Sequence, residues 1–313
     1  MTVVRVEAPA RLHMGMLAAA GEGSRRFGGL GAAVSRPAVV LEAQAADELS
    51  ADGPEAERVL AFARRCHDAL GLEGGARLRV VEAIRAHVGL GSGTKLALAV
   101  AQALATLHGR NLEAPQLAEA VGRAARSAVG MWTFAFGGLV VEGGQRHGLE
   151  RPAPLLARYR VPEAWRVVLV VPHADPGLSG VAEQEAFERL VPSGGRSAAI
   201  AQLVLTSLLP ALVEADVEEF GAALTRVQEL VGDAFATVQG GRFHPRAGAL
   251  VEALLDHGAA GAGQSSWGPA VYGIAGSEEA GRELAARMAD AVGGEGSVEL
   301  VTFDDRGARV QTS

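Results

Sequence analysis

Apolar and polar residues follow two different rhythms along this chain of 313 residues. Short alternating or wholly apolar runs predict strands, because side chains on a strand alternate between its two faces. These runs are residues 3–6, where the strand continues onward, and residues 39–42, 77–84, 137–142, 166–171, 270–275 and 298–302. Apolar residues spaced three and four positions apart predict helices. These stretches are 55–70, 94–107, 113–125, 181–191, 195–213, 217–231, 246–257 and 278–292. The order of elements predicts an α+β protein whose second half is largely helical.

The length and a change in composition favour two domains. A chain of this length exceeds the usual size of a single domain. The proline-containing segment from Arg151 to Pro162 interrupts the periodic pattern, and we place the boundary there. The expected domains are residues 1–160 and residues 161–313.

Composition narrows the class of protein. Hydrophobic residues make up 49% of the chain and the formal net charge is −7, so a globular protein is expected and nucleic-acid binding has little electrostatic support. The single cysteine, Cys66, excludes an internal disulfide framework. The N-terminus does not read as a signal peptide, and no run reaches the roughly 18 apolar residues of a membrane span. These features predict a cytoplasmic enzyme with neither a nucleic-acid nor a membrane partner.

The most informative segment is a glycine-rich loop that runs into an apolar helix. Gly89, Gly91 and Gly93 allow tight turns and a close approach of a ligand to the backbone. Free N–H groups and the positive end of the helix dipole favour an anion at that point. We therefore predict a phosphate or diphosphate site, the alternative being an ordinary helix start with flexible glycines. The residues of this predicted site are Gly89, Leu90, Gly91, Ser92, Gly93, Thr94 and Lys95.

The polar side chains of this segment can each be interpreted in two ways, as ligand contacts or as parts of an ordinary helix. The hydroxyls of Ser92 and Thr94 can reach phosphate oxygens or cap the helix. Lys95 either adds positive charge to the site or points to solvent.

Two earlier segments supply arginines. Arg11 and His13 lie two positions apart on a predicted strand, so their side chains point to the same side. Arg11 there is either a ligand contact or half of a structural ion pair. Arg25 and Arg26 precede a glycine-rich stretch, and a guanidinium can bind an anion through two parallel hydrogen bonds. Their alternative is simple surface exposure.

Polar turns are the remaining candidates. Residues 258–269 are rich in small residues, and we expect this turn to close over a ligand that the glycine loop holds. Its polar part consists of Gln264, Ser265, Ser266 and Trp267. Arg126 and Ser127 follow a predicted helix, whereas Ser179 precedes one, where it could be an N-cap and nothing more.

Taken in this order, the segments resemble the superfamily of galacto-, homoserine, mevalonate and phosphomevalonate kinases. The motifs that carry this resemblance are Pro9-Ala-Arg-Leu, Gly89-Leu-Gly-Ser-Gly-Thr and the glycine-rich stretch 258–266. The likeness is closer to a branch without kinase activity, the β-ribofuranosylaminobenzene 5′-phosphate synthases. The segments that resemble this branch are 10–13, 25–31, 89–99, 126–130, 177–180 and 263–269.

The resemblance implies both a fold and a reaction. The fold is that of the kinases, with a ribosomal-protein-S5-like α+β N-terminal domain and a ferredoxin-like α/β C-terminal domain. The synthases join 5-phosphoribosyl 1-diphosphate to 4-aminobenzoate, or in some members to 4-hydroxybenzoate, and release carbon dioxide and diphosphate. Their product begins tetrahydromethanopterin synthesis. The resemblance further implies Mg²⁺ as a cofactor and a homodimer.

Roles for the candidate residues follow from the same resemblance. The loop would take the diphosphate, with Mg²⁺ sharing the charge, and Arg25 or Arg26 would take a phosphate. Arg11, Arg126 or the turn 264–267 would hold the aromatic acid. The expected catalytic residues are Arg11, His13 and Arg126. The expected substrate-binding residues are Arg25, Arg26, the seven residues 89–95, Ser127, Ser179 and the four residues 264–267.

Two positions depart from the related patterns. The kinases usually carry an Asp two residues after the glycine that matches Gly130, and Trp132 here can neither accept a proton nor hold Mg²⁺. An acidic residue is also expected near Ala18, and Glu22 or Glu142 would have to replace it as a metal ligand. The missing Asp removes the usual base of kinase chemistry and favours the synthase branch. An ATP-dependent small-molecule kinase that uses the same glycine loop is the second hypothesis. Ala18 and Trp132 also leave open a diverged, non-catalytic phosphometabolite-binding protein.

Overall fold

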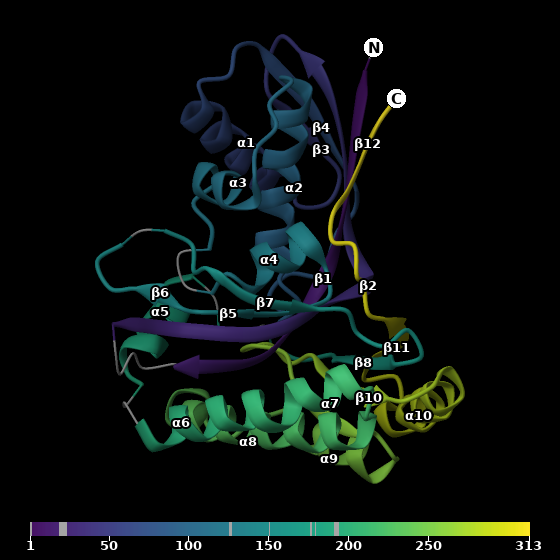
Figure 1. Ribbon diagram of the computed structural model, residues 1–313. Helices are drawn as coiled ribbons and strands as arrows, with labels where there is room; N and C mark the ends of the chain where they lie inside the picture. Colours follow the sequence, from purple (N-terminus) through teal and green to yellow (C-terminus); the bar gives the residue numbers. More distant parts are fainter. Residues whose placement is uncertain are drawn as a thin grey trace.

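The computed structural model describes residues 2–18, 24–124, 127–149, 151–175, 177–178, 180–190 and 194–313. Two sheets, each covered by helices, make up the molecule, and both chain ends lie together at one end of it (Figure 1). The mixture of antiparallel strands and helices confirms the predicted α+β class.

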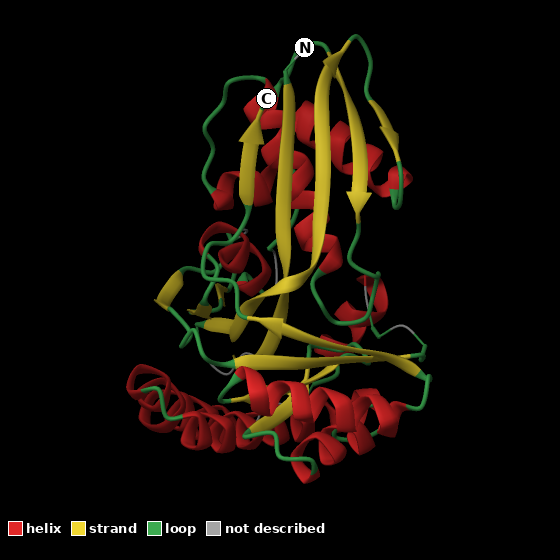
Figure 2. Ribbon diagram, turned by 90° about the vertical axis from the view of Figure 1, so that its right-hand side faces the viewer, coloured by secondary structure: helices red, strands yellow, loops and turns green. Residues whose placement is uncertain are grey.

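The first sheet is built around two long strands. Its strands in spatial order are β12 (Arg309–Thr312), β1 (Val3–Ala18), β2 (Arg25–Ala46), β4 (Gly75–Glu82) and β3 (Ser50–Asp52). The strands β5 (Leu139–Glu142) and β6 (Gln145–Arg146) pair with β2, and β7 (Leu155–Tyr159) pairs with β5. All of these pairs are antiparallel except β3 with β4. Figure 2 shows how the long strands run from one end of the molecule toward the other.

Four helices belong to the first half of the chain. They are α1 (Ala56–Leu70), α2 (Ser92–Leu107), α3 (Ala114–Ala120) and α4 (Val129–Phe136). The helix α2 contacts β1, β2, α1, α3 and α4, and it buries ten of its residues. This confirms the prediction of a helix that is apolar on nearly all sides and therefore central.

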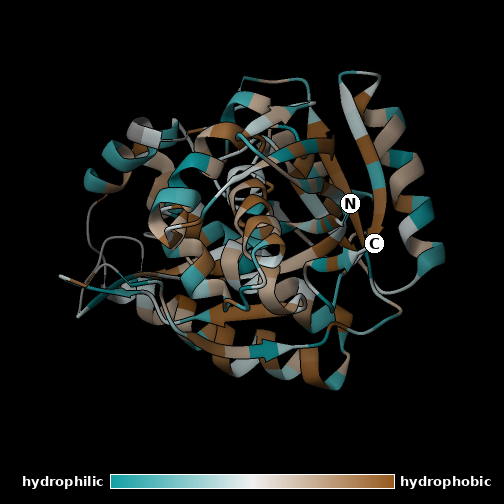
Figure 3. Ribbon diagram, turned by 90° about the horizontal axis from the view of Figure 1, so that it is seen from above, coloured by the Kyte–Doolittle hydropathy of each residue, from teal (hydrophilic) through white to brown (hydrophobic). Residues whose placement is uncertain are grey.

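The second sheet is antiparallel, with the order β11–β8–β10–β9. Its strands are β8 (Arg166–Pro172), β9 (Gly261–Gln264), β10 (Val271–Ala275) and β11 (Gly296–Thr302). The helices of this half are α5 (Gly180–Glu188), α6 (Gly194–Leu203), the π-helical turn η1 (Val204–Leu208), α7 (Leu209–Glu214), α8 (Val217–Gln239), α9 (Gly248–Asp256) and α10 (Glu278–Val292). The helices α8, α9 and α10 contact this sheet. Seen from above, hydrophilic colours lie mainly along the outer helices (Figure 3).

The structure corrects several predicted boundaries. The strand predicted over 39–42 begins much earlier, because the glycine-rich stretch 25–31 is the start of β2 and pairs there with β1 and β5. The helix predicted over 113–125 ends at Ala120, because the chain turns at Gly122 and Ala124, both of which have a positive φ. The helix α4 was not predicted, although it lies in an apolar stretch.

The C-terminal segment returns to the first sheet. The expected boundary at residue 160 falls between β7 of the first sheet and β8 of the second. The strand β12, however, pairs with β1, so residues 309–312 join the sheet of the first half although the sequence placed them in the domain 161–313. Four residues carry too weak a periodicity to show this, and the paired residues Glu7 and Arg309 stand at opposite ends of the chain.

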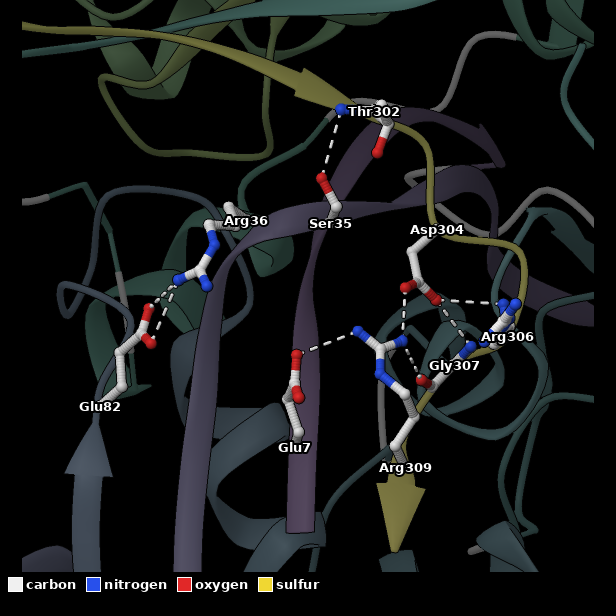
Figure 4. A network of polar contacts seen from close by, with 9 residues as sticks. All are labelled: Glu7, Ser35, Arg36, Glu82, Thr302, Asp304, Arg306, Gly307 and Arg309. Carbon is white, nitrogen blue, oxygen red and sulfur yellow. Dashed lines mark hydrogen bonds and ion pairs between the residues drawn. The ribbon is translucent and has the colours of Figure 1, made fainter. Parts of the chain in front are cut away.

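A buried carboxylate holds this return in place (Figure 4). Asp304 is 8% exposed, and its carboxylate accepts hydrogen bonds from the N–H groups of Arg306 at 3.1 Å and Gly307 at 2.8 Å and from Arg309 Nη1 at 2.6 Å. Arg309 Nη2 in turn donates to Glu7 Oε1 at 3.0 Å. Asp304 therefore connects the turn before β12 to the sheet.

Among the described residues, one helical stretch, Gly195–Glu214, is long and apolar enough to cross a membrane, and 33% of an 18-residue window within it is buried against the rest of the chain. Core helices meet the same criterion.

We expect Asp304→Ala to lower the free energy of unfolding by about 3 kcal/mol, because it leaves the turn amides and the Arg309 guanidinium without their acceptor. The control is Arg36→Ala, which removes the exposed Arg36–Glu82 ion pair of Figure 4 and should cost less than about 1 kcal/mol. Urea unfolding of both variants measures the difference. Equal losses would show that Asp304 does not hold the turn.

Candidate active site

A pocket of about 180 Å³ lies where β1, the start of α2, α5, α8 and the turn after β9 meet. The strand β1 reaches this place because it continues to Ala18, with register shifts between Pro9 and Arg11 and between His13 and Gly15. Seven of the predicted site residues line it, namely Arg11, His13, Thr94, Ser127, Gln264, Ser266 and Trp267. The expectation that Arg11 and His13 share one side is thereby confirmed.

Arg11 joins β1 to the glycine loop, residues 89–93. Its backbone N–H donates to Leu90 O at 3.1 Å, and its Nη1 donates to Gly89 O. Gly91 has φ 79°, and a Cβ at this position would lie 3.1 Å from Arg11 Cγ and 3.2 Å from Nε. Among the described residues, the fully buried Nε of Arg11 has no hydrogen-bond partner. Arg11 also lines the pocket, so its guanidinium brings positive charge there.

Burial perturbs Arg11 without neutralising it. Desolvation lowers the pKa of Arg11 to about 10, and Glu183, which lines the same pocket, opposes that shift. The guanidinium therefore stays charged at neutral pH.

The start of α2 carries further positive charge. Ser92 and Gly93 are the first two residues of the helix, so their N–H groups have no acceptor within it. A Cβ on Gly93 would lie 2.9 Å from Arg58 Nη2 and 3.3 Å from Arg123 Nη2. Two guanidiniums therefore stand over the helix start, and one of them, Arg123, also lines the pocket.

Lys95 does not point to solvent, so that interpretation of its side chain is wrong. Lys95 has no exposed surface and donates from Nζ to Thr133 Oγ1 at 3.0 Å inside the core. Burial, and next the charge of Arg11, hold the pKa of Lys95 well below its usual range. The side chain points away from the helix start because the fourth residue of α2 already belongs to the buried face.

His13 and Ser127 meet at the pocket, and a buried carboxylate, Glu142, lies behind the backbone of the same segment. His13 Nε2 lies 3.1 Å from Ser127 Oγ, which accepts from Val129 N at 3.3 Å. Glu142 is fully buried, and its carboxylate accepts from Gly144 N at 2.7 Å and Ala128 N at 3.3 Å. Desolvation raises the pKa of Glu142 to about 7, against the effect of these hydrogen bonds. Desolvation, and next the charge of Arg11, lower the pKa of His13 to about 3.

An aromatic wall made of Phe187, Phe235 and Trp267 lines the same pocket. The ring of Trp267 lies 4.4 Å from Phe235 and 5.3 Å from Phe187, measured between centroids. These rings offer an apolar surface on which a planar ligand can pack.

The turn 264–267 packs directly on the glycine loop. Ser265 Oγ donates to Gly89 O at 2.7 Å, and a Cβ on Gly268 would lie 2.1 Å from the carbonyl carbon of Val88. Gln264 is held by His244 N at 2.6 Å and donates to Ser266 O at 2.8 Å. Ser265 therefore has a structural part in the loop contact, and closure of the turn over a ligand stays a prediction.

Some predicted residues lie elsewhere. Arg25 and Arg26 are exposed at the start of β2, where Arg25 Nη1 donates to Gly144 O at 2.8 Å and Arg26 lies 5.1 Å above the Phe27 ring. Neither lines the pocket. Arg126 and Ser179 fall outside the described residues.

The described residues do not fit a magnesium site made by the protein alone. No group of three or more His, Cys, Asp or Glu side chains converges among them. Glu142, a candidate replacement ligand, already accepts from two backbone amides, and Glu22 lies outside the described residues. Glu183 is the carboxylate that the described residues bring to the pocket.

Known families and proteins match this chain in sequence. Models of the GHMP kinases N terminal domain and the GHMP kinases C terminal region match residues 57–138 and 208–294. A β-ribofuranosylphenol 5′-phosphate synthase of Methanothermobacter thermautotrophicus is 30% identical, over 97% of each chain. One of Archaeoglobus fulgidus is 36% identical, over 91% of this chain and 92% of its own. The chain belongs to the β-ribofuranosylphenol 5′-phosphate synthase family.

Solved structures show that this family shares the GHMP kinase fold. A homoserine kinase from Cytophaga hutchinsonii superimposes with a TM-score of 0.75 at 20% identity, covering 99% of this chain and 97% of its own. The Methanococcus jannaschii mevalonate kinase gives 0.69 at 15% identity, covering 96% and 98%. The predicted fold is confirmed, and the chain is an enzyme of the synthase type by its relatives.

Trp132 marks a difference from the kinase pattern within that fold. Its indole N–H donates to Ala153 O at 2.8 Å, and its ring stacks on Phe136 at 5.9 Å. It does not line the pocket. The residue thus has a packing role at the position where a kinase of the superfamily is expected to keep its carboxylate.

Sequence reasoning missed the contribution of α8. Gln228, Val231 and Phe235 of this helix line the pocket, and Gln228 also bonds Met14 O and Gln264 N. A polar Gln within a stripe spaced three and four residues apart is the available signal. The sequence did not single out Arg58 and Arg123 as site residues, because charged residues at helix ends are common on any protein surface.

Gly91→Ala should weaken diphosphate binding at least about 10-fold, which corresponds to about 1.4 kcal/mol, because the methyl group displaces Arg11 from the loop. Gly109→Ala, at the other end of α2, is the matched control: its φ is 63° and nothing lies within 4 Å of its Cβ. Both variants should lose about 1 kcal/mol of stability from the positive φ. Calorimetric titration with diphosphate compares them, and undiminished affinity in Gly91→Ala would refute the loop assignment.

Glu142 should make the protein less stable as the pH rises. Its folded pKa of about 7 exceeds the ordinary value of 4.5, so its contribution is complete below pH 4.5 and is lost as the pH passes 7. Relative to Glu142→Gln, the wild type should lose about 2 to 3 kcal/mol from about pH 5 to about pH 8. Taking this difference at each pH removes the opposite contribution of His13. A difference that is constant with pH would contradict the raised pKa.

Proposed function

We propose that this enzyme transfers the 5-phosphoribosyl group of 5-phosphoribosyl 1-diphosphate to a para-substituted benzoate, with release of carbon dioxide and diphosphate. The preferred acceptor is 4-hydroxybenzoate, with 4-aminobenzoate as the second candidate. The relatives are named β-ribofuranosylphenol 5′-phosphate synthases, and a phenol product supports the hydroxyl compound. The product would enter tetrahydromethanopterin synthesis, in the cytoplasm.

The observation that carries this proposal is the composition of the pocket. Arg11 and Arg123 bring positive charge to the start of α2, and Phe187, Phe235 and Trp267 supply an aromatic wall to the same pocket. An anionic sugar phosphate needs the first set and a benzoate ring needs the second. A site for two aliphatic substrates would not need the wall.

The chemistry places distinct demands on these two sets. The bond from the anomeric carbon to diphosphate breaks, and its electron pair leaves with the diphosphate. The ring carbon that bears the carboxylate attacks the anomeric carbon and forms the new carbon–carbon bond. The bond to the carboxylate then breaks, and its electron pair restores the aromatic ring. Positive groups at the start of α2 would stabilise the leaving diphosphate, and the wall would hold the ring in line.

Two associated predictions belong to this proposal. Because Mg²⁺ commonly binds through substrate phosphates and one or two carboxylates, we expect it to arrive with the diphosphate. The homodimer expected from the resemblance is likewise part of the proposal.

A kinase reaction has less support. Trp132 packs against Ala153 and Phe136 and supplies no base. The fold itself does not distinguish a kinase from a synthase, because the similar GHMP kinase structures are 20% identical to this chain or less.

The test is release of labelled carbon dioxide. The full chain is incubated with 5-phosphoribosyl 1-diphosphate, Mg²⁺ and carboxyl-labelled 4-hydroxybenzoate, or 4-aminobenzoate in parallel. We expect carbon dioxide and diphosphate in equal amounts, with neither released when one substrate is omitted. Diphosphate binding without carbon dioxide release would favour the non-catalytic paralogue. Thermal stabilisation by ATP, without a response to 5-phosphoribosyl 1-diphosphate, would favour a kinase.

A further inference from the structure

Three arginines gather beside the pocket, where α1, the start of α2 and the end of α3 come together. Arg58 and Arg65 lie on α1, and Arg123 follows α3. The helix α1 contacts both α2 and α3 (Figure 1). Arg58, Phe62 and Arg65 are spaced four and three residues apart, so their side chains lie on one face of α1. This face carries two guanidiniums on either side of an aromatic ring.

Arg58 and Arg123 are directed to the start of α2. A Cβ on Gly93 would lie 2.9 Å from Arg58 Nη2 and 3.3 Å from Arg123 Nη2. Arg58 is held there by Glu55, whose Oε2 lies 2.5 Å from Nη1. The Arg123 guanidinium lies 5.0 Å from the centre of the Phe62 ring. Both cations therefore belong to the place where the diphosphate is proposed to bind.

Arg65 stands at the rim of the same pocket, against Gly122. A Cβ on Gly122 would lie 2.2 Å from Arg65 Cζ and 2.2 Å from Nη2, so the guanidinium packs directly on the backbone of this glycine. Gly122 lines the pocket and has φ 63°. Arg65 is exposed, and within the described part of the chain its side chain makes neither a hydrogen bond nor an ion pair. The donors of this guanidinium are therefore open to a ligand at the rim.

Other cations that a second anionic group could use are engaged or lie elsewhere. Arg242 lines the pocket, but its Nε and Nη2 donate to the carboxylate of Asp233 at 2.8 Å and 3.4 Å. Lys95 is turned into the core. Arg25 and Arg26, which the sequence suggested for a phosphate, do not line the pocket.

We propose that Arg65 binds the 5-phosphate of the phosphoribosyl substrate, while the start of α2 with Arg58 and Arg123 holds the diphosphate. This inference rests on the proposed function and deepens it, since that substrate carries anionic groups on both sides of its ribose. Arg58 and Arg65 are seven residues apart, which separates their backbone positions by about 10 Å along α1. This separation leaves room for a ribose between the two groups. A guanidinium can bind a phosphate through two parallel hydrogen bonds.

Gly122 is required for this placement of Arg65. Any side chain at this position would occupy the space of the guanidinium, and the positive φ also favours glycine. The 5-phosphate does not change during the reaction, so Arg65 would bind the substrate and its transition state equally. Loss of this contact should therefore act on KM and spare kcat.

The first experiment compares two neighbouring arginines of α1 in the full chain. Arg65→Ala should raise the KM for 5-phosphoribosyl 1-diphosphate about 10-fold and change kcat less than about 2-fold. The matched control is Arg64→Ala, which removes the same charge from an exposed residue on another face of the helix. It should leave both constants unchanged.

A glycine pair tests the same contact without removing a charge. Gly122→Ala should reproduce the effect of Arg65→Ala, because the methyl group displaces the guanidinium. Its control is Gly71→Ala at the end of α1, where φ is 56° and nothing lies within 4 Å of the added Cβ. This variant carries a similar backbone strain and should keep the KM of the wild type.

A binding measurement separates the two ends of the substrate without turnover. In calorimetric titrations, Arg65→Ala should weaken the binding of ribose 5-phosphate about 10-fold and leave the affinity for diphosphate unchanged. Gly91→Ala should show the opposite pattern. If the wild type released no carbon dioxide but bound ribose 5-phosphate through Arg65, the proposed function would fail and the phosphate site would stand.

Three results would overturn the assignment of Arg65. The first is normal carbon dioxide release with an unchanged KM in Arg65→Ala, which would leave the proposed function intact. The second is equal affinity of Arg65→Ala and Arg64→Ala for ribose 5-phosphate. The third is an equal loss of affinity for ribose 5-phosphate and diphosphate in Arg65→Ala, because it would indicate a general effect of charge in place of a separate site.

Discussion

The carbonyl oxygen of Gly89 is the point at which the two halves of this molecule are joined around the pocket. It accepts from Arg11 Nη1 on β1 and from Ser265 Oγ at 2.7 Å on the turn after β9. The backbones meet without intervening side chains, since a Cβ on Gly89 would lie 2.1 Å from Ser265 O. The start of α2, the Arg11 guanidinium and the aromatic turn take their positions from this contact. Glycine is required here for close approach, independently of any ligand.

Burial of charge is the second constraint. The same region holds Arg11, His13 and Glu142. The pKa values of Arg11 and His13 are lowered, and the pKa of Glu142 is raised. Each shift disfavours the charged form, as expected when groups leave water. Hydrogen bonds to Gly89 O, Ser127 and two backbone amides compensate in part. Such an arrangement is unfavourable in a core that only has to be stable, and it is typical of sites where protons or anions are handled.

The fold accommodates more than one chemistry because the scaffold and the reacting groups are separable. GHMP kinases and this chain share the architecture at TM-scores of 0.69 to 0.75. Trp132, at the position of the expected kinase carboxylate, has become part of the packing with Phe136. The polar groups of the pocket come instead from β1 and the segment before α4, and its apolar wall comes from α5, α8 and the turn after β9.

The sequence by itself determined the helix α2, most strands and the family, because these depend on local periodicity and on ordered motifs. It also indicated that Arg11 and His13 share a side, since that follows from strand geometry alone. It did not reveal that Lys95 is buried, that Arg25 and Arg26 lie outside the pocket, or that β12 returns to β1. These outcomes depend on which residues of distant elements meet. The pairing of His13 with Ser127 was decided only by tertiary structure, because contacts across 114 residues leave no local pattern in a single sequence.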